Sequence, residues 1–211
     1  MKFYIVKFIV LTVYLTFPVT ISAQDNSQAL YPGFGIEELI ARTYGEGEFE
    51  IVETLAVYPQ FTRQLIRYDS DDLSIYGFMN VPAGEGPFPV VIAVHGFVPP
   101  EEYETLAYTT PYADALARAG YLVIHPNLRG HVPSDDDGVR VFEEVGYAVD
   151  VLNLIAHVRE QGLVPGDLAL ANAFRIGLWG HSMGGIITLR VITVDRTISS
   201  AVLYGSMSAD E

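Results

Sequence analysis

The chain has 211 residues, half of them hydrophobic, which is enough for one substantial buried core. Its formal net charge of −14 at pH 7 disfavours binding to nucleic acid or to an anionic membrane surface. It contains no cysteine, which excludes disulfide bonds, thiolate metal sites and cysteine nucleophiles.

Residues 1–23 have the layout of a secretory signal peptide. Lys2 and Lys7 give a positive start, an apolar run covers Phe8–Phe17, and Ala23 is a small residue at a cleavage point. An uncleaved membrane anchor or a buried first helix are the alternatives, but the run is short for a span of about 20 apolar residues. We therefore expect export to a secreted or periplasmic location, with no membrane attachment after cleavage.

Residues 24–60 are expected to form an N-terminal extension. Helical periodicity is short, over 36–42, and glycines at 45 and 47 break it. The sequence does not indicate a purpose for this segment beyond a short arm that packs on the domain.

Residues 61–211 have the pattern of an α/β domain. Two strands joined by a polar turn come first, followed by strands that alternate with helices, which favours a largely parallel sheet flanked by helices. The predicted strands are 61–67, 73–81, 90–94, 121–124, 174–179 and 199–204, and the predicted helices are 101–119 (with Pro111 as a possible division), 143–161 and 183–194.

The helix over 143–161 has an amphipathic pattern, with one apolar stripe and one polar stripe. We expect the apolar stripe to face the core and the polar stripe to face solvent. The apolar residues are Val145, Ala148, Leu152 and Ile155, and the polar residues are Asp150, Asn153, His157 and Glu160.

Gly180-His-Ser-Met-Gly184 matches the G-x-S-x-G motif of a nucleophile elbow. An apolar strand precedes it and a helical segment follows it, which is the context the motif requires. The tight turn would raise the Ser182 hydroxyl above the carboxyl edge of the sheet, and the next helix would aim its N-terminal amides at a developing negative charge. The alternative is a glycine-rich turn whose serine only caps a helix. We predict that Ser182 is a catalytic nucleophile.

His95-Gly-Phe97 directly follows the central strand, where a serine hydrolase places its second oxyanion donor. We predict an oxyanion hole made of the backbone N–H groups of Phe97 and Met183. On its own, His-Gly after a strand would be only a tight turn.

Together these motifs resemble the α/β-hydrolase superfamily, and more narrowly the catalytic domain of the prolyl oligopeptidase family. The narrower resemblance rests on His125-Pro-Asn-Leu-Arg-Gly130 and on Arg175-Ile-Gly-Leu-Trp179 before the elbow. Two features differ from that family: Gly96 is followed by Phe97 instead of a second glycine, and there is no room upstream for a β-propeller. Stand-alone relatives include esterases as well as peptidases.

The resemblance implies that an acid and a histidine follow the nucleophile in chain order, but no histidine follows Ser182. We interpret the chain as a hydrolase domain that is incomplete at its C-terminus and therefore essentially inactive. None of the five histidines fits the position of a general base. We expect His95 to brace the oxyanion turn, His181 to point away from the hydroxyl, His157 to be exposed, and His125 and His131 to be structural.

Two acidic features suggest further roles, and the simpler reading is favoured for both. Asp210 follows the last predicted strand and could be the acid of a triad, although a surface carboxylate is the simpler interpretation. Ser134-Asp-Asp-Asp-Gly138 suggests calcium, but ligating loops space their acids at alternate positions. We therefore predict no metal and no cofactor.

The hypothesis that follows is a secreted serine hydrolase that cleaves peptide or ester acyl bonds, with a prolyl oligopeptidase-like peptidase favoured. A carboxylesterase or lipase-like acyl hydrolase is the first alternative. A non-catalytic binding domain on the same fold is the second, although such a domain has no need of a strained serine. The expected partner is a peptide or ester substrate.

Overall fold

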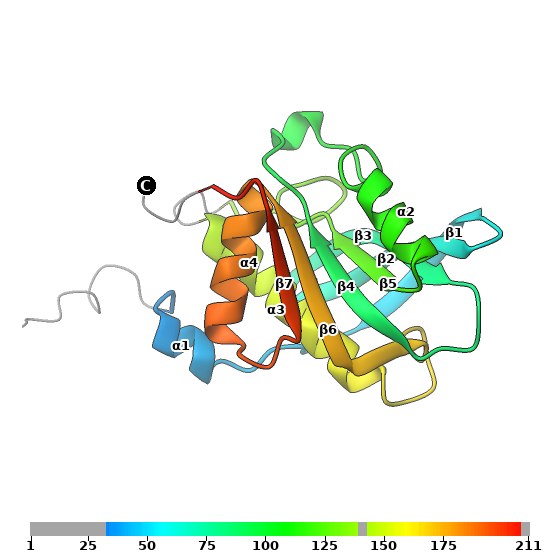
Figure 1. The fold of residues 1–211 in the computed structure, drawn as a ribbon. Helices are drawn as coiled ribbons and strands as arrows, with labels where there is room; N and C mark the ends of the chain where they lie inside the picture. Colours follow the sequence, from blue (N-terminus) through cyan, green and yellow to red (C-terminus); the bar gives the residue numbers. More distant parts are fainter. Residues whose placement is uncertain (1–32, 139–142, 208–211) are drawn as a thin grey trace, which may run out of the picture. The chain divides into compact units, whose positions relative to one another are not determined.

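The computed structural model describes residues 33–138 and 143–207 (Figure 1). The predicted signal peptide and Asp210 lie outside these residues. The elements are, in chain order, α1 (Ile36–Ala41), β1 (Phe49–Val57), β2 (Phe61–Ser70), β3 (Leu73–Pro82), β4 (Phe88–Val94), the short 3-10 helix η2 (Pro100–Glu102), α2 (Thr110–Arg118), β5 (Leu122–Pro126), α3 (Glu143–Gln161), β6 (Ala171–His181), α4 (Met183–Val194) and β7 (Ser200–Tyr204).

The strands form a seven-stranded mixed sheet in the order β1-β2-β3-β5-β4-β6-β7. Strands β5, β4, β6 and β7 pair in parallel, while β1, β2 and β3 join through antiparallel pairs. The carboxyl ends of the four parallel strands therefore meet at one edge of the sheet. This arrangement confirms the predicted α/β-hydrolase fold with a mostly parallel sheet.

The sheet is covered on both faces (Figure 1). Alternate residues of the central strands β4 and β5 enter different apolar clusters, as the two-residue period of a strand requires. The larger cluster lies under α3 and α4 and includes Ile92 and Ile124, whereas the smaller cluster lies under α2 and includes Ala93 and Val123. Continuous apolar runs such as Val90–Val94 follow from this burial on both sides.

Strand β1 lies within the range 24–60, where only a short helix was expected. It pairs antiparallel with β2, with Phe49 opposite Tyr68, and its register shifts twice along its length. Phe49 is buried in the main core, whereas Val52 and Val57 are exposed. Because only its first residues show a clear inward pattern, its periodicity gives a weak strand signal.

The exposure predicted for the polar stripe of α3 is wrong for three of its four residues, whereas Glu160 is exposed as expected. Asp150, Asn153 and His157 are all buried, because the β2–β3 hairpin and the segment after α1 pack against this side of the helix. Asn153 accepts a hydrogen bond from Gly45 N (2.9 Å), and His157 Nε2 donates to the carbonyl of Asp69 (3.0 Å). Polar residues are tolerated inside when each has partners. A polar stripe therefore does not by itself indicate a solvated helix face.

The helix predicted over 101–119 is divided further than Pro111 alone suggested. Helix α2 begins only at Thr110, with Pro111 in its first turn, where a missing N–H costs nothing. Buried Tyr103 and Thr109 instead hold the preceding loop against His125.

Among residues 33–138 and 143–207, no helix is long and apolar enough to cross a membrane.

Candidate active site

Ser182 is held in an unusual backbone conformation between β6 and α4. Strand β6 ends at His181 and α4 begins at Met183, so the chain reverses direction within one residue. The dihedral angles of Ser182 are φ 52° and ψ −118°. A positive φ is uncommon for a residue with a side chain and costs of order 1–3 kcal/mol. Such strain is typical of a functional position, and here it matches the sharp turn that the motif predicts.

The glycines of the motif allow close packing around this turn. A side-chain carbon on Gly184 would lie 2.2 Å from the carbonyl oxygen of Val94, and one on Gly180 would lie 2.2 Å from the carbonyl oxygen of Gly184. Both distances are far below van der Waals contact. The elbow therefore sits directly on the end of β4, and neither glycine can be replaced without displacing backbone.

The turn after β4 lies beside Ser182. A side-chain carbon on Gly96 would lie 3.1 Å from Cβ of Ser182, so the Gly96–Phe97 peptide and the elbow are neighbours. Met183 is the first residue of α4, where backbone N–H groups have no partner within the helix. The structure thus brings together the two segments that carry the predicted oxyanion donors. The roles of Phe97 and Met183 themselves remain predictions.

His95 is fully buried and contacts the Gly96–Phe97 turn. Its Nδ1 lies 2.7 Å from the carbonyl oxygen of Gly96, and its Nε2 lies 2.9 Å from that of Asn127. Burial lowers the pKa of this imidazole to about 4, so the ring is neutral at physiological pH. These contacts agree with a ring that braces the turn.

His125 and His131 are also buried, and their ring centroids lie 5.5 and 4.9 Å from that of His95. His125 is hydrogen-bonded to Tyr103 and Thr109, and burial lowers its pKa well below the usual value. The ring nitrogens of His131 lie near the carbonyl groups of Arg129 and Val98, both at 3.2 Å. These contacts are typical of histidines with a structural role.

His181 is hydrogen-bonded through Nδ1 to the hydroxyl of Tyr108. Tyr108 belongs to the loop before α2, and sequence reasoning missed it because an isolated tyrosine in a non-periodic segment carries no signal. Within the described part of the chain, no hydrogen bond joins a histidine ring to the Ser182 hydroxyl.

An aromatic cluster lies next to the elbow, on the sheet face that α2 covers. The Trp179 ring lies 4.7 Å from that of Tyr112 and is stacked with those of His181 and Tyr204, at 6.3 and 6.2 Å between centroids. This cluster fixes the side-chain directions at the ends of β6 and β7.

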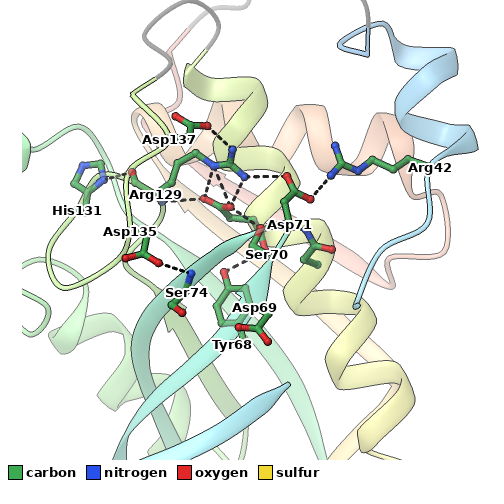
Figure 2. A network of polar contacts seen from close by, with 12 residues as sticks. Arg42, Tyr68, Asp69, Ser70, Asp71, Ser74, Arg129, His131, Asp135 and Asp137 are labelled. Carbon is green, nitrogen blue, oxygen red and sulfur yellow. Dashed lines mark hydrogen bonds and ion pairs between the residues drawn. The ribbon is translucent and has the colours of Figure 1, made fainter. Parts of the chain in front are cut away.

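The acidic loop 134–138 has protein partners for its carboxylates (Figure 2). Asp135 accepts a hydrogen bond from the backbone of Ser74 (2.8 Å), and Asp137 pairs with Arg129 (2.7 Å). No group of three or more metal-ligating side chains occurs in the described ranges. These carboxylates therefore tie the loop to the β2–β3 hairpin and to the end of β5.

A family model described as "Serine aminopeptidase, S33" matches residues 85–211, which include the Gly96–Phe97 turn and the elbow. The chain belongs to this family. The S33 assignment and the sheet topology together place it in the α/β-hydrolase superfamily.

Other proteins similar to this S33 chain carry esterase and peptidase names. YitV of Bacillus subtilis (strain 168), provisionally named an esterase, is 31% identical over 155 residues, which are 67% of this chain and 55% of YitV. Acetyl xylan esterase 1 from Thermoanaerobacterium sp. JW/SL YS485 aligns with a TM-score of 0.61 at 16% identity, covering 82% of this chain and 59% of that one. The acylaminoacyl peptidase of Pyrococcus horikoshii aligns with a TM-score of 0.56 at 25% identity, covering 72% and 24%. The chain thus spans about half the length of YitV.

Proposed function

We propose that this protein is a serine acyl hydrolase that acts on carboxylic esters, with Ser182 as the nucleophile. The observation that carries the proposal is the strained conformation of Ser182, φ 52° and ψ −118°, at the junction of β6 and α4. A serine that only caps a helix adopts ordinary extended angles and gains nothing from such strain.

The chemistry proposed is acyl transfer through a covalent intermediate. The Ser182 oxygen attacks the ester carbonyl carbon, and the carbonyl oxygen becomes an anion. The amides of Phe97 and Met183 donate hydrogen bonds to that anion, each contributing about 3–4 kcal/mol in the transition state. The alcohol leaves with a proton, and water then releases the acid and regenerates the serine.

An ester substrate is favoured over a peptide because the esterase names among relatives and neighbours outweigh the peptidase reading first favoured by the motifs. A peptidase is the second candidate. It is supported by the family description and by the 25% identical acylaminoacyl peptidase. Comparing hydrolysis of p-nitrophenyl acetate with that of an aminoacyl p-nitroanilide separates the two.

We also propose that the protein is exported, on the strength of Lys2, Lys7 and the apolar run at 8–17. N-terminal sequencing of the protein from the medium or the periplasm would show a start near residue 24. An intact Met1 in that material contradicts processing.

None of the described histidines is a candidate for the general base. His95, His125, His131 and His157 are buried on other partners, and His181 is bound to Tyr108. We therefore propose that the 211-residue chain hydrolyses esters very slowly unless a base is supplied. Loss of the base costs several orders of magnitude in rate.

Imidazole added to the solution tests the nucleophile under these conditions, because it can take the serine proton in place of a histidine. We expect imidazole to accelerate hydrolysis of p-nitrophenyl acetate by the chain well above the same mixture with Ser182→Ala. The variant controls for hydrolysis by imidazole alone. Equal rates with both proteins, together with no labelling of Ser182 by a fluorophosphonate, would refute the proposed nucleophile. Rapid turnover without imidazole would refute the inactivity only.

A further inference from the structure

The hydroxyl of Tyr108 lies between the two backbone segments that carry the predicted oxyanion donors. It is hydrogen-bonded to Nδ1 of His181, the residue before Ser182. Gly96, the residue before Phe97, packs closely against the same hydroxyl. A side-chain carbon on Gly96 would lie 2.3 Å from this oxygen and 3.1 Å from Cβ of Ser182. The hydroxyl, the turn and the nucleophile therefore share one small volume.

The Tyr108 hydroxyl has a proton that it can donate to Nδ1 of His181. Burial raises the pKa of the Tyr108 hydroxyl, so the donor remains protonated at neutral pH.

The loop that carries Tyr108 is itself anchored. The neighbouring Thr109 is fully buried, and its hydroxyl lies 2.8 Å from Nδ1 of His125. Tyr103, at the other end of the loop, is hydrogen-bonded to Nε2 of the same ring (2.8 Å). A group that sets the separation of two segments must be fixed to something rigid, and these contacts meet that condition.

We propose that Tyr108 is a positioning residue: its hydroxyl ties the Gly96–Phe97 turn to the His181–Met183 elbow and sets the separation at which both amides point at one oxyanion. This inference rests on the proposed function. Oxyanion donors act at about 2.7–3.1 Å from the developing charge, so a small widening of the gap weakens them. Because the oxyanion exists only in the transition state, the loss falls on kcat and leaves KM unchanged.

Tyr108→Phe removes the hydroxyl and keeps the ring, and Tyr112→Phe is the matched control. Tyr112 lies in the first turn of α2, is partly exposed, and its hydroxyl makes no hydrogen bond within the described residues. With imidazole-assisted ester hydrolysis as the assay, we expect kcat to fall about 10- to 100-fold in Tyr108→Phe with KM within about two-fold. We expect Tyr112→Phe to stay within about two-fold of the original chain in both constants. Equal losses in the two variants, or an unchanged kcat in Tyr108→Phe, overturn the proposal.

Amide hydrogen exchange tests the bridge without depending on hydrolysis. We expect the Gly96 amide to exchange at least about ten-fold faster in Tyr108→Phe than in Tyr112→Phe, because the turn opens more easily without the hydroxyl that holds it against the elbow. His181→Phe, which keeps the ring but removes Nδ1, should add little to Tyr108→Phe in the double variant, since both break one bridge. If the chain is inactive even with imidazole but exchange changes as expected, the proposed function fails while the bridge stands. Unchanged exchange at Gly96 refutes the bridge.

Discussion

Arg129 and Asp150 form a buried ion pair that joins the loop after β5 to the middle of α3. The guanidinium Nη2 lies 2.7 Å from Oδ1, and the Arg129 backbone N–H donates to Oδ2 at 2.8 Å. Ser70 donates a further hydrogen bond to the same carboxylate (2.7 Å). Burial alone would lower the pKa of Arg129, but the charge and hydrogen bonds of Asp150 and Asp137 hold that pKa above its usual range.

Asp150→Asn should destabilise the fold strongly, because it leaves the Arg129 cation buried without its main partner. We expect a loss of about 3–5 kcal/mol in the free energy of unfolding, measured by urea titration with circular dichroism. Glu50→Gln breaks the exposed pair with Arg67 and should cost no more than about 1 kcal/mol. Similar losses in the two variants would contradict a special role for the buried pair.

Two replacements of Ser182 test its backbone strain separately from its proposed role as the nucleophile. Ser182→Gly should raise the free energy of unfolding by about 1 kcal/mol, because glycine adopts a positive φ without steric cost. Ser182→Ala keeps a side-chain carbon and should leave stability unchanged. Neither variant should react with a fluorophosphonate. If Ser182→Gly is no more stable than Ser182→Ala in urea titrations, the turn is not strained.

Gly184→Ala should disrupt the elbow, since the added carbon would lie 2.2 Å from the Val94 carbonyl oxygen. We expect a loss of about 1–3 kcal/mol or more in unfolding free energy. The matched substitution is Gly166→Ala, where nothing lies within 4 Å of the added carbon. It should be nearly neutral. A Gly184→Ala protein as stable as Gly166→Ala would show that the close contact can relax without cost.

The buried histidines should make the fold acid-sensitive. His95 has a pKa of about 4 in the fold because of burial, against an ordinary value near 6.5, and burial lowers that of His125 as well. Between these pH values the unfolded chain binds more protons than the folded chain, so the free energy of unfolding decreases as pH falls from 6.5 to 4. His95 alone should lower the free energy of unfolding by about 3 kcal/mol at pH 4, and it should have no effect on that free energy above pH 6.5.

Urea midpoints at pH 7 and pH 5 measure this dependence. An NMR titration should show that the His95 ring stays neutral at pH 5 in the folded protein. A ring that protonates near pH 6.5 without loss of structure would contradict the assignment.

The order of strands and helices after residue 61 could be predicted from the sequence, because hydrophobic period and turn residues act locally. The runs at 90–94 and 174–179 are predicted as strands, and they extend to Phe88–Val94 and Ala171–His181 in the structure. The elbow was also readable, since its motif lies within one strand–helix unit, although Gly184 also packs against Val94 of β4.

Long-range partners could not be read in this way. The pattern of α3 did not reveal that Asp150 and His157 are buried, because their partners Arg129 and Asp69 are distant in the chain. The same holds for Tyr108, whose meaning depends on His181, 73 residues further on. Local period decides which face of a helix is apolar, but only the tertiary fold decides what covers the other face.

The position of Trp179 has a practical consequence. It is the chain's single tryptophan, and it lies on β6 three residues before Ser182, stacked with His181 and Tyr204. Intrinsic emission excited near 295 nm therefore comes from one chromophore near Ser182. A shift of that emission at a lower urea concentration than the loss of helical ellipticity would mean that the end of β6 loosens before the rest of the sheet.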